Sequence, residues 1–242
     1  MAVDIWSDIA CPWCYIGKRK FEAGLAAFDG AADVSVTYHS FELSPATPID
    51  FDGNEVDFLS AHKGMPAGQV AQMLQQVGDI ARSVGLHYDF DRIRHTNTLK
   101  AHEALHYAKA QGKQLELVER LFKAYFEQGE HLGKPERLAE LAAEIGLDRD
   151  EVRKALESGR FTDAVQGDLE QAQAYGINGV PFFVIDGRYG VSGAQNPETF
   201  TAALAQAHAE AAKRTNLTPL GAAAAEACAD GSCAVPATKS GK

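Results

Sequence analysis

The sequence lacks a run of apolar residues long enough to cross a membrane, and its first residues do not show the pattern of a secretory leader, so we do not expect export. Charged residues interrupt every apolar stretch before the roughly 18 to 20 residues that a membrane-spanning helix needs. The segment Met1–Asp8 contains acids and no basic region followed by an apolar core. We therefore expect a soluble protein of the cytoplasm, without a membrane partner.

Basic residues are also scarce relative to acids. The chain has 23 Lys and Arg residues against 33 Asp and Glu residues, which gives a formal net charge of −10 at pH 7. This balance repels the phosphates of nucleic acids at long range, so we expect no nucleic-acid partner. Hydrophobic residues make up 45% of the 242 residues, which suffices for one core with an insertion or for two small domains.

Cysteine is rare, but its four positions form two close pairs. Four cysteines are too few to staple a chain of this length, and in a reducing compartment paired cysteines more often serve catalysis or metal binding. Two residues separate Cys11 from Cys14, and four separate Cys228 from Cys233 near the C-terminus. The cysteines therefore indicate chemistry rather than a disulfide framework.

The predicted order of elements is that of a thioredoxin fold interrupted by helices. An apolar strand at residues 3–6 leads to Cys11 and a helix, and residues 34–41 alternate with the period of a second strand. Residues 55–175 show helical patterns and almost no strand signal. Strand character returns over 181–192 around an Asp-Gly turn, before a last helix.

We therefore predict an α/β protein whose thioredoxin-like domain comes from both chain ends, residues 1–50 and 176–213. An all-helical insertion domain is predicted over residues 51–175. Residues 214–242 are rich in Ala, Gly and Ser and are predicted to form a flexible tail that carries the second cysteine pair. The helix-start signals within the insertion are Asn97, Pro135 and Asp148.

Cys11 and Cys14 have the spacing of a redox-active dithiol. Disulfide exchange needs one ionised, accessible sulfur and a second sulfur that can reach it and release the mixed disulfide. At the start of a helix, Cys11 would face unpaired backbone N–H groups, which favour its thiolate, so we predict it as the nucleophile. Cys14, one turn further in and shielded, is the predicted resolving thiol. Because Pro12 and Trp13 carry no charge, we expect a less oxidising pair than one with histidine between the cysteines.

A proline is expected opposite the dithiol. Pro181 precedes a strand at the place where a thioredoxin fold holds a cis-proline, and proline adopts the cis form at low cost. The backbone of Val180 would then be free to pair with an extended substrate. An ordinary proline at a strand edge is the alternative. Pro12, Trp13, Val180 and Pro181 are accordingly the predicted substrate contacts.

The motifs around these residues resemble those of a known family. The segment Cys11–Lys18 (CPWCYIGK), with Ser7-Asp8 upstream and Gly179–Phe183 (GVPFF) downstream, is similar to the DsbA-like thioredoxin superfamily and in particular to its cytoplasmic FrnE branch. The resemblance covers about residues 1–212. It implies a thiol:disulfide oxidoreductase or isomerase with a helical insertion, acting on protein or small-thiol disulfides. It implies no cofactor beyond the redox-active disulfide, with glutathione as a candidate co-substrate.

Two alternatives use the same cysteines differently. The superfamily includes 2-hydroxychromene-2-carboxylate isomerases and kappa-class glutathione transferases, which generally lack the second active-site cysteine, so Cys14 favours dithiol chemistry. A glutathione-dependent isomerase or transferase, in which Cys11 contacts glutathione, is the enzymatic alternative. The non-enzymatic alternative is a redox sensor or a zinc-binding module that uses all four sulfurs.

Two further groups are candidates for supporting roles. Cys228 and Cys233 flank a turn-prone Asp-Gly and could relay electrons to the dithiol, although Glu226 and Asp230 oppose thiolate formation there. Two inert thiols are the alternative. Asp4, on the strand before the active loop, could accept the proton of the resolving thiol if buried, and a solvated aspartate is its alternative.

Other distinctive side chains are expected to be structural. His102 and His106 stand four residues apart on one predicted helix, a spacing that can bind metal, but no third ligand is evident. We expect a core or surface histidine pair there and no metal site. The aromatic residues Phe122, Tyr125 and Phe126 are expected in the core. The sequence predicts no particular oligomeric state.

Overall fold

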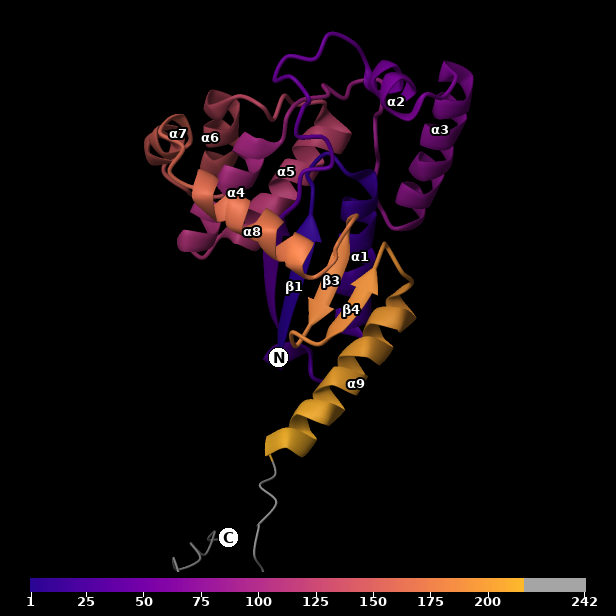
Figure 1. The fold of residues 1–242 in the computed structure, drawn as a ribbon, viewed down its shortest axis with the longest axis vertical. Helices are drawn as coiled ribbons and strands as arrows, with labels where there is room; N and C mark the ends of the chain where they lie inside the picture. Colours follow the sequence, from indigo (N-terminus) through magenta and orange to yellow (C-terminus); the bar gives the residue numbers. More distant parts are fainter. Residues whose placement is uncertain (216–242) are drawn as a thin grey trace, which may run out of the picture. The chain divides into compact units, whose positions relative to one another are not determined.

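The sheet of the described chain is built from strands near both chain ends. A computed structural model describes residues 1–215 of the protein, with side chains up to residue 211. Strand β1 (Ala2–Ser7) is parallel to β2 (Ser35–Ser40) and antiparallel to β3 (Phe182–Ile185). Strand β4 (Tyr189–Ser192) pairs antiparallel with β3, which gives the order β2-β1-β3-β4 (Figure 1). The predicted thioredoxin topology is confirmed.

One face of the sheet is covered by the two helices that belong to the thioredoxin-like part. Phe183 on β3 lies between α1 (Pro12–Ala26) and α9 (Pro197–Thr215). Its ring centroid is 5.4 Å from that of Phe21 on α1 and 4.6 Å from that of Phe200 on α9. Because all three rings are almost completely buried, this cluster supplies much of the packing energy on this face.

The opposite face of the sheet is covered by a helix of the insertion. Strand alternation places Trp6 and Val184 on this face, where they pack with Ala172 and Ile177. The Trp6 indole N–H also donates a hydrogen bond of 3.0 Å to the Asp168 carbonyl, so the buried ring has a polar partner. These contacts join the insertion to the sheet.

The insertion between β2 and β3 is helical, as predicted. Figure 1 shows most of the insertion helices gathered beyond the end of the sheet at which β1 finishes. Residues Met1–His208 form one compact unit, and the proposed domain limits at residues 50 and 175 stay a prediction. None of the helices described here is long and apolar enough to cross a membrane. The helices are α2 (Glu55–Lys63), α3 (Ala67–Ser83), α4 (Leu99–Ala110), α5 (Gln114–Gln128), α6 (Pro135–Glu144), α7 (Arg149–Glu157) and α8 (Thr162–Ala174).

Local signals set several of the element boundaries. Pro135 is the first residue of α6, and the Asp148 carboxylate accepts a hydrogen bond from the Glu151 N–H at the start of α7. The N-cap residue of α4 is Thr98, one residue later than the predicted Asn97. The Asn97 side chain still accepts a hydrogen bond from the N–H group of Leu99, the first residue of the helix. At the tip of the hairpin, Asp186 and its neighbouring glycine both have positive φ, as an Asp-Gly turn between antiparallel strands requires.

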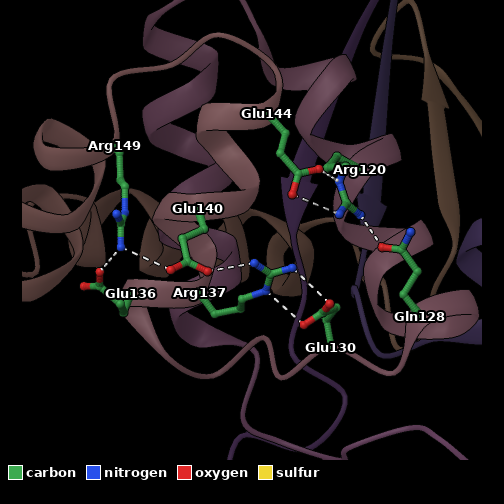
Figure 2. A network of polar contacts seen from close by, with 8 residues as sticks. All are labelled: Arg120, Gln128, Glu130, Glu136, Arg137, Glu140, Glu144 and Arg149. Atoms are coloured by element: carbon green, nitrogen blue, oxygen red, sulfur yellow. Dashed lines mark hydrogen bonds and ion pairs between the residues drawn. The ribbon is translucent and has the colours of Figure 1, made fainter.

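An ion-pair network crosses the outer surface of helices α5, α6 and α7 (Figure 2). Arg137 bridges two carboxylates, with contacts of 2.9 Å to Glu130 and 2.7 Å to Glu140. Exposed ion pairs of this kind each contribute little to the free energy of folding. The network therefore affects the relative orientation of the helices more than the stability of the protein. Its members are Arg120, Gln128, Glu130, Glu136, Arg137, Glu140, Glu144 and Arg149.

Candidate active site

The dithiol lies where β1 passes into α1. Cys11 is the N-cap of the helix, with an extended backbone (φ −89°, ψ 113°), and Pro12 occupies the first helical position. The Cys11 N–H donates to the Asp8 carbonyl at 3.1 Å, and the Cys14 N–H donates to the Cys11 carbonyl at 3.0 Å. Both cysteines are free thiols. Cys11 therefore lies at the helix start, as predicted, but its side chain accepts no hydrogen bond from the first-turn amides, and its role as the nucleophile stays a prediction.

The Cys11 sulfur faces the segment before β3. Its thiol donates a hydrogen bond of 3.7 Å to the carbonyl of Val180, and the Val180–Pro181 peptide bond is cis. The sulfur is less open than expected, because Cys11 is only 4% exposed. A disulfide must therefore approach it through the cavity described below. The predicted meeting of Cys11 with a cis-proline is confirmed.

Gly17 lets α1 approach Pro181 closely. A Cβ atom at position 17 would lie 2.8 Å from Cγ of the proline, a distance that real Cβ contacts essentially never show. The next turn of the same helix thus holds the cis-proline beside the dithiol. The glycine of the CPWCYIG segment is explained by this contact rather than by any need for a positive φ.

Cys14 lies behind Cys11 and is 2% exposed. Its pKa is well above the usual value, first because burial disfavours the thiolate and second because of the hydrogen bond and charge of Cys11. The Ser7 side chain and the Asp8 backbone, both next to the sulfur, act in the opposite direction. The expected shielding of Cys14 is confirmed, and its role in resolution stays a prediction.

The buried acid beside the dithiol is Asp8, which the sequence analysis did not select. Its carboxylate accepts hydrogen bonds from the N–H groups of Leu43, at 2.8 Å, and Ala10, at 3.3 Å, and lies 3.4 Å from His102 Nε2. Burial alone would raise the pKa of Asp8, but the nearby His102 side chain, followed by the two amides, lowers it. An aspartate that bonds its own i+2 amide just after a strand was the available signal.

Asp4 is not part of the dithiol site. Its carboxylate lies 3.0 Å from His39 Nε2 and is about one-third exposed, at 31%. Strand alternation explains the difference, because positions 4 and 7 of β1 point to opposite faces and it is Ser7 that faces Cys14. The predicted proton acceptor therefore lies on the wrong face of the sheet.

A cavity of about 400 Å³ opens beside Cys11. Cys11, Pro12 and Trp13 form one wall, and α2 and α3 form the other with mainly apolar side chains. Trp13 is 39% exposed, so its indole is available to a bound molecule. Of the predicted substrate contacts, Pro12 and Trp13 line this cavity, while Val180 and Pro181 do not, although the Val180 carbonyl contacts the Cys11 sulfur. The apolar wall is formed by Phe58, Leu59, Met73, Leu74, Val77 and Ile80.

The two histidines of α4 lie in the interior. His106 Nε2 is 2.9 Å from the Asp168 carboxylate, and His102 is 1% exposed next to Asp8. Within residues 1–215 no cluster of three His, Cys, Asp or Glu side chains could hold a metal ion. Cys228 and Cys233 lie outside the described residues, so neither the relay nor a site with four sulfurs is tested.

Comparisons with known proteins agree with this geometry. A family model described as the DSBA-like thioredoxin domain matches residues 2–205. The crystal structure of the probable DsbA oxidoreductase SCO1869 from Streptomyces coelicolor is 42% identical and covers 98% of this chain and 100% of its own, with a TM-score of 0.83. The uncharacterized protein YwbO of Bacillus subtilis (strain 168) is 28% identical over 207 residues, which are 84% of this chain and 94% of that protein. A 2-hydroxychromene-2-carboxylate isomerase shares the fold, with 15% identity, a TM-score of 0.66 and coverage of 89% and 100%.

Proposed function

The chain belongs to the DSBA-like thioredoxin domain family, and from this we propose that it is a thiol:disulfide oxidoreductase/isomerase acting through Cys11 and Cys14. The observation that carries the proposal is the position of Cys11. Its sulfur lies at the N-terminus of α1, against Val180 and a cis-proline, with a second thiol buried behind it. Such an arrangement supports a nucleophile followed by an intramolecular resolving thiol.

The cycle uses only these two sulfurs. The Cys11 thiolate attacks a substrate disulfide, forms a mixed disulfide, and releases the first substrate thiolate. The Cys14 thiolate then attacks the Cys11 sulfur, which forms the Cys11–Cys14 disulfide and releases the second substrate thiolate. The substrate gains two electrons and the protein loses two. The reverse sequence oxidises a dithiol, and interruption after the first step allows isomerisation.

We propose protein or small-thiol disulfides as substrates. The cavity beside Cys11 offers room for a group attached to the attacked sulfur, and the exposed indole of Trp13 offers an apolar contact at its edge. On the other side of the sulfur, the backbone at Val180 could pair with an extended chain. In the cytoplasm, which we propose as its compartment, such a protein would mainly reduce or isomerise disulfides.

Replacement of the resolving thiol tests the proposal. We expect Cys14→Ser to abolish catalytic reduction of insulin and to accumulate a mixed disulfide on Cys11, since the first attack is intact and the second is lost. Cys11→Ser should abolish both. A glutathione-dependent isomerase or transferase would instead keep its turnover in Cys14→Ser, and this outcome would overturn the dithiol cycle. Titration of the wild-type dithiol in glutathione buffers then gives the direction of exchange.

We propose that Cys228 and Cys233 exchange electrons with the Cys11–Cys14 pair. Deleting the residues after Pro219 should slow reoxidation of the dithiol. Unchanged reoxidation and turnover would leave these cysteines without a redox role. Stoichiometric zinc bound by all four sulfurs in protein purified without chelator would favour the metal-binding alternative over both redox proposals.

A further inference from the structure

Ser7 has a buried hydroxyl group without a hydrogen-bond partner. It is the last residue of β1 and is 5% exposed, and its Oγ makes no hydrogen bond of normal geometry in the part of the chain that the structure describes. Its main chain is satisfied, because the Ser7 carbonyl accepts from the Phe41 N–H at 3.1 Å. Buried hydroxyl groups are normally paired, so an orphan beside a reactive site requires an explanation.

The orphan hydroxyl faces the resolving thiol. Alternation along β1 puts Ser7 on the same face as Ile5, towards α1, whose first turn carries Cys14. Both Ser7 and Cys14 are almost completely buried, so water cannot readily form hydrogen bonds with either side chain. The pKa of Cys14 is raised mainly by burial and then by Cys11, and the Ser7 side chain is the first of the groups that oppose this rise. The neutral thiol leaves the hydroxyl unpaired, whereas a thiolate would be a strong acceptor for it.

We propose that Ser7 is a catalytic residue of the resolving step, whose hydroxyl donates a hydrogen bond to the Cys14 sulfur when that sulfur becomes a thiolate. The inference rests on the proposed dithiol cycle and adds to it a group that touches the second reacting atom. It also explains why an unpaired hydroxyl is present in the dithiol form: its partner is formed only during turnover.

The chemistry of the step balances without an additional reactant. In the mixed disulfide, the Cys14 thiol loses its proton to water or hydroxide, and the Ser7 hydroxyl keeps its own proton while donating to the new anion. The thiolate attacks the Cys11 sulfur, so the Cys11–Cys14 bond forms and the bond from Cys11 to the substrate sulfur breaks. The substrate leaves as a thiolate and takes a proton from solvent.

The expected effect of removing the hydroxyl is moderate. Loss of one donor to a buried thiolate should lower the thiolate fraction of Cys14 on the order of tenfold at neutral pH. The remaining thiolate is more basic and a better nucleophile, with a Brønsted coefficient of about 0.4–0.5, so resolution should slow about threefold.

The test uses the reduced full chain in a Cys228→Ser/Cys233→Ser background, mixed with one equivalent of 5,5′-dithiobis(2-nitrobenzoate) in a stopped-flow instrument. Attack by Cys11 releases one coloured thiolate, and resolution by Cys14 releases a second, so the two steps appear as separate phases. We expect Ser7→Ala to slow the second phase about threefold and to leave the first unchanged. Ser7→Thr, which retains a hydroxyl, should restore the second phase.

The matched control is Ser40→Ala. Ser40 pairs with Ser7 in the β1–β2 register and is also buried, but its hydroxyl lies 3.2 Å from His106 Nε2. This variant should leave both phases unchanged. An equal slowing in Ser40→Ala and Ser7→Ala would show a structural effect and overturn the proposal, as would an unchanged second phase in Ser7→Ala. Absence of any second phase in the parent protein would instead overturn the dithiol cycle itself.

The pH dependence of Cys14 reactivity distinguishes a hydrogen bond from Ser7 to the thiolate from a purely structural role of Ser7, because a structural role would leave this dependence unchanged. In a Cys11→Ser/Cys228→Ser/Cys233→Ser background, the rate of iodoacetamide alkylation reports the thiolate of Cys14 alone. We expect Ser7→Ala to shift the midpoint of this profile to higher pH, and Ser7→Thr to return it. Coincident midpoints for the Ser7→Ala variant and its parent would show that the hydroxyl does not stabilise the thiolate.

Discussion

At the scale of single residues, contacts between α1 and Pro181 leave no room for a side chain at position 17. We expect Gly17→Ala to destabilise the protein by about 1 kcal/mol, because overpacking costs about 1–3 kcal/mol while alanine gains about 1 kcal/mol over glycine in a helix. Displacement of Pro181 should also slow disulfide exchange. Urea unfolding and insulin reduction measure the two effects.

Gly167→Ala provides the matched control for this prediction. Gly167 lies in α8, is exposed, and a Cβ there would meet nothing within 4 Å. The control should gain roughly 1 kcal/mol from helix propensity alone and leave exchange unchanged. Equal stabilisation by both alanine substitutions would show that the contact with Pro181 has no energetic importance.

The two cysteines of the dithiol could be predicted because a separation of two residues is typical of redox-active cysteine pairs. Cys11 and Cys14 are predicted in this way, and Pro181 is predicted from its place before a strand of a thioredoxin fold; the cis bond and the helix-start position agree with the expectation. Asp4, the candidate proton acceptor if buried, is partly exposed on the opposite face of the sheet, and the buried acid of the site is Asp8. Which acid lies near the dithiol depends on the face of β1 to which each residue points and on His102 from α4. The spacing within the CxxC motif determines neither.

At the scale of elements, a buried lysine ties α1 to α5. Lys18 is 6% exposed, and its Nζ lies 2.6 Å from a carboxylate oxygen of Glu119, which also binds Arg19 and accepts from Tyr15 Oη at 2.7 Å. Burial alone would raise the pKa of Glu119, but the hydrogen bonds from Arg19 and Lys18 lower it to about 2. The carboxylate therefore stays charged across the working range and holds two cations of α1.

We expect Glu119→Gln to destabilise the protein by roughly 1–2 kcal/mol, less than the loss of a fully buried pair because the carboxylate is partly exposed. Glu136→Gln is the control, since Glu136 belongs to the surface network of Figure 2 and is 57% exposed. The control should change stability by less than about 0.5 kcal/mol. Chemical denaturation of both variants measures the difference, and equal losses would contradict the structural importance of this contact.

The positions of helices and strands along the chain could be predicted, but the way they pack together could not. Helical periodicity located the insertion, and the Pro135 and Asp148 signals located two helix starts. The cavity beside Cys11 could not be predicted, because its walls come from α2, α3 and the active loop, which periodicity does not place relative to one another. Apolar positions in α3 looked like any amphipathic helix, and only the tertiary arrangement makes some of them cavity walls.

At the scale of the whole molecule, a cluster of histidines and acids joins the sheet to the insertion. His39 on β2 lies 2.6 Å from the Asp168 carboxylate on α8 and 3.0 Å from Asp4 on β1. The same carboxylate of Asp168 reaches His106 on α4 at 2.9 Å. Burial would lower the pKa of His39, but Asp168 and then Asp4 raise it, while Lys109 opposes the rise. Burial would raise the pKa of Asp168, but His106 and His39 lower it.

These shifts predict an optimum of stability in weak acid. The contribution of His39 is complete below its unfolded pKa of about 6.5 and is lost as the pH rises through its higher folded value. The contribution of Asp168 is complete above about pH 3.9 and is lost as the pH falls through its lower folded value. We therefore expect His39→Gln to flatten the fall of Tm between about pH 6 and 8.5, because the variant has no proton to lose there. His87→Gln, at an exposed position, should retain the wild-type slope, and parallel slopes in all three proteins would exclude this cluster as the origin of the pH dependence.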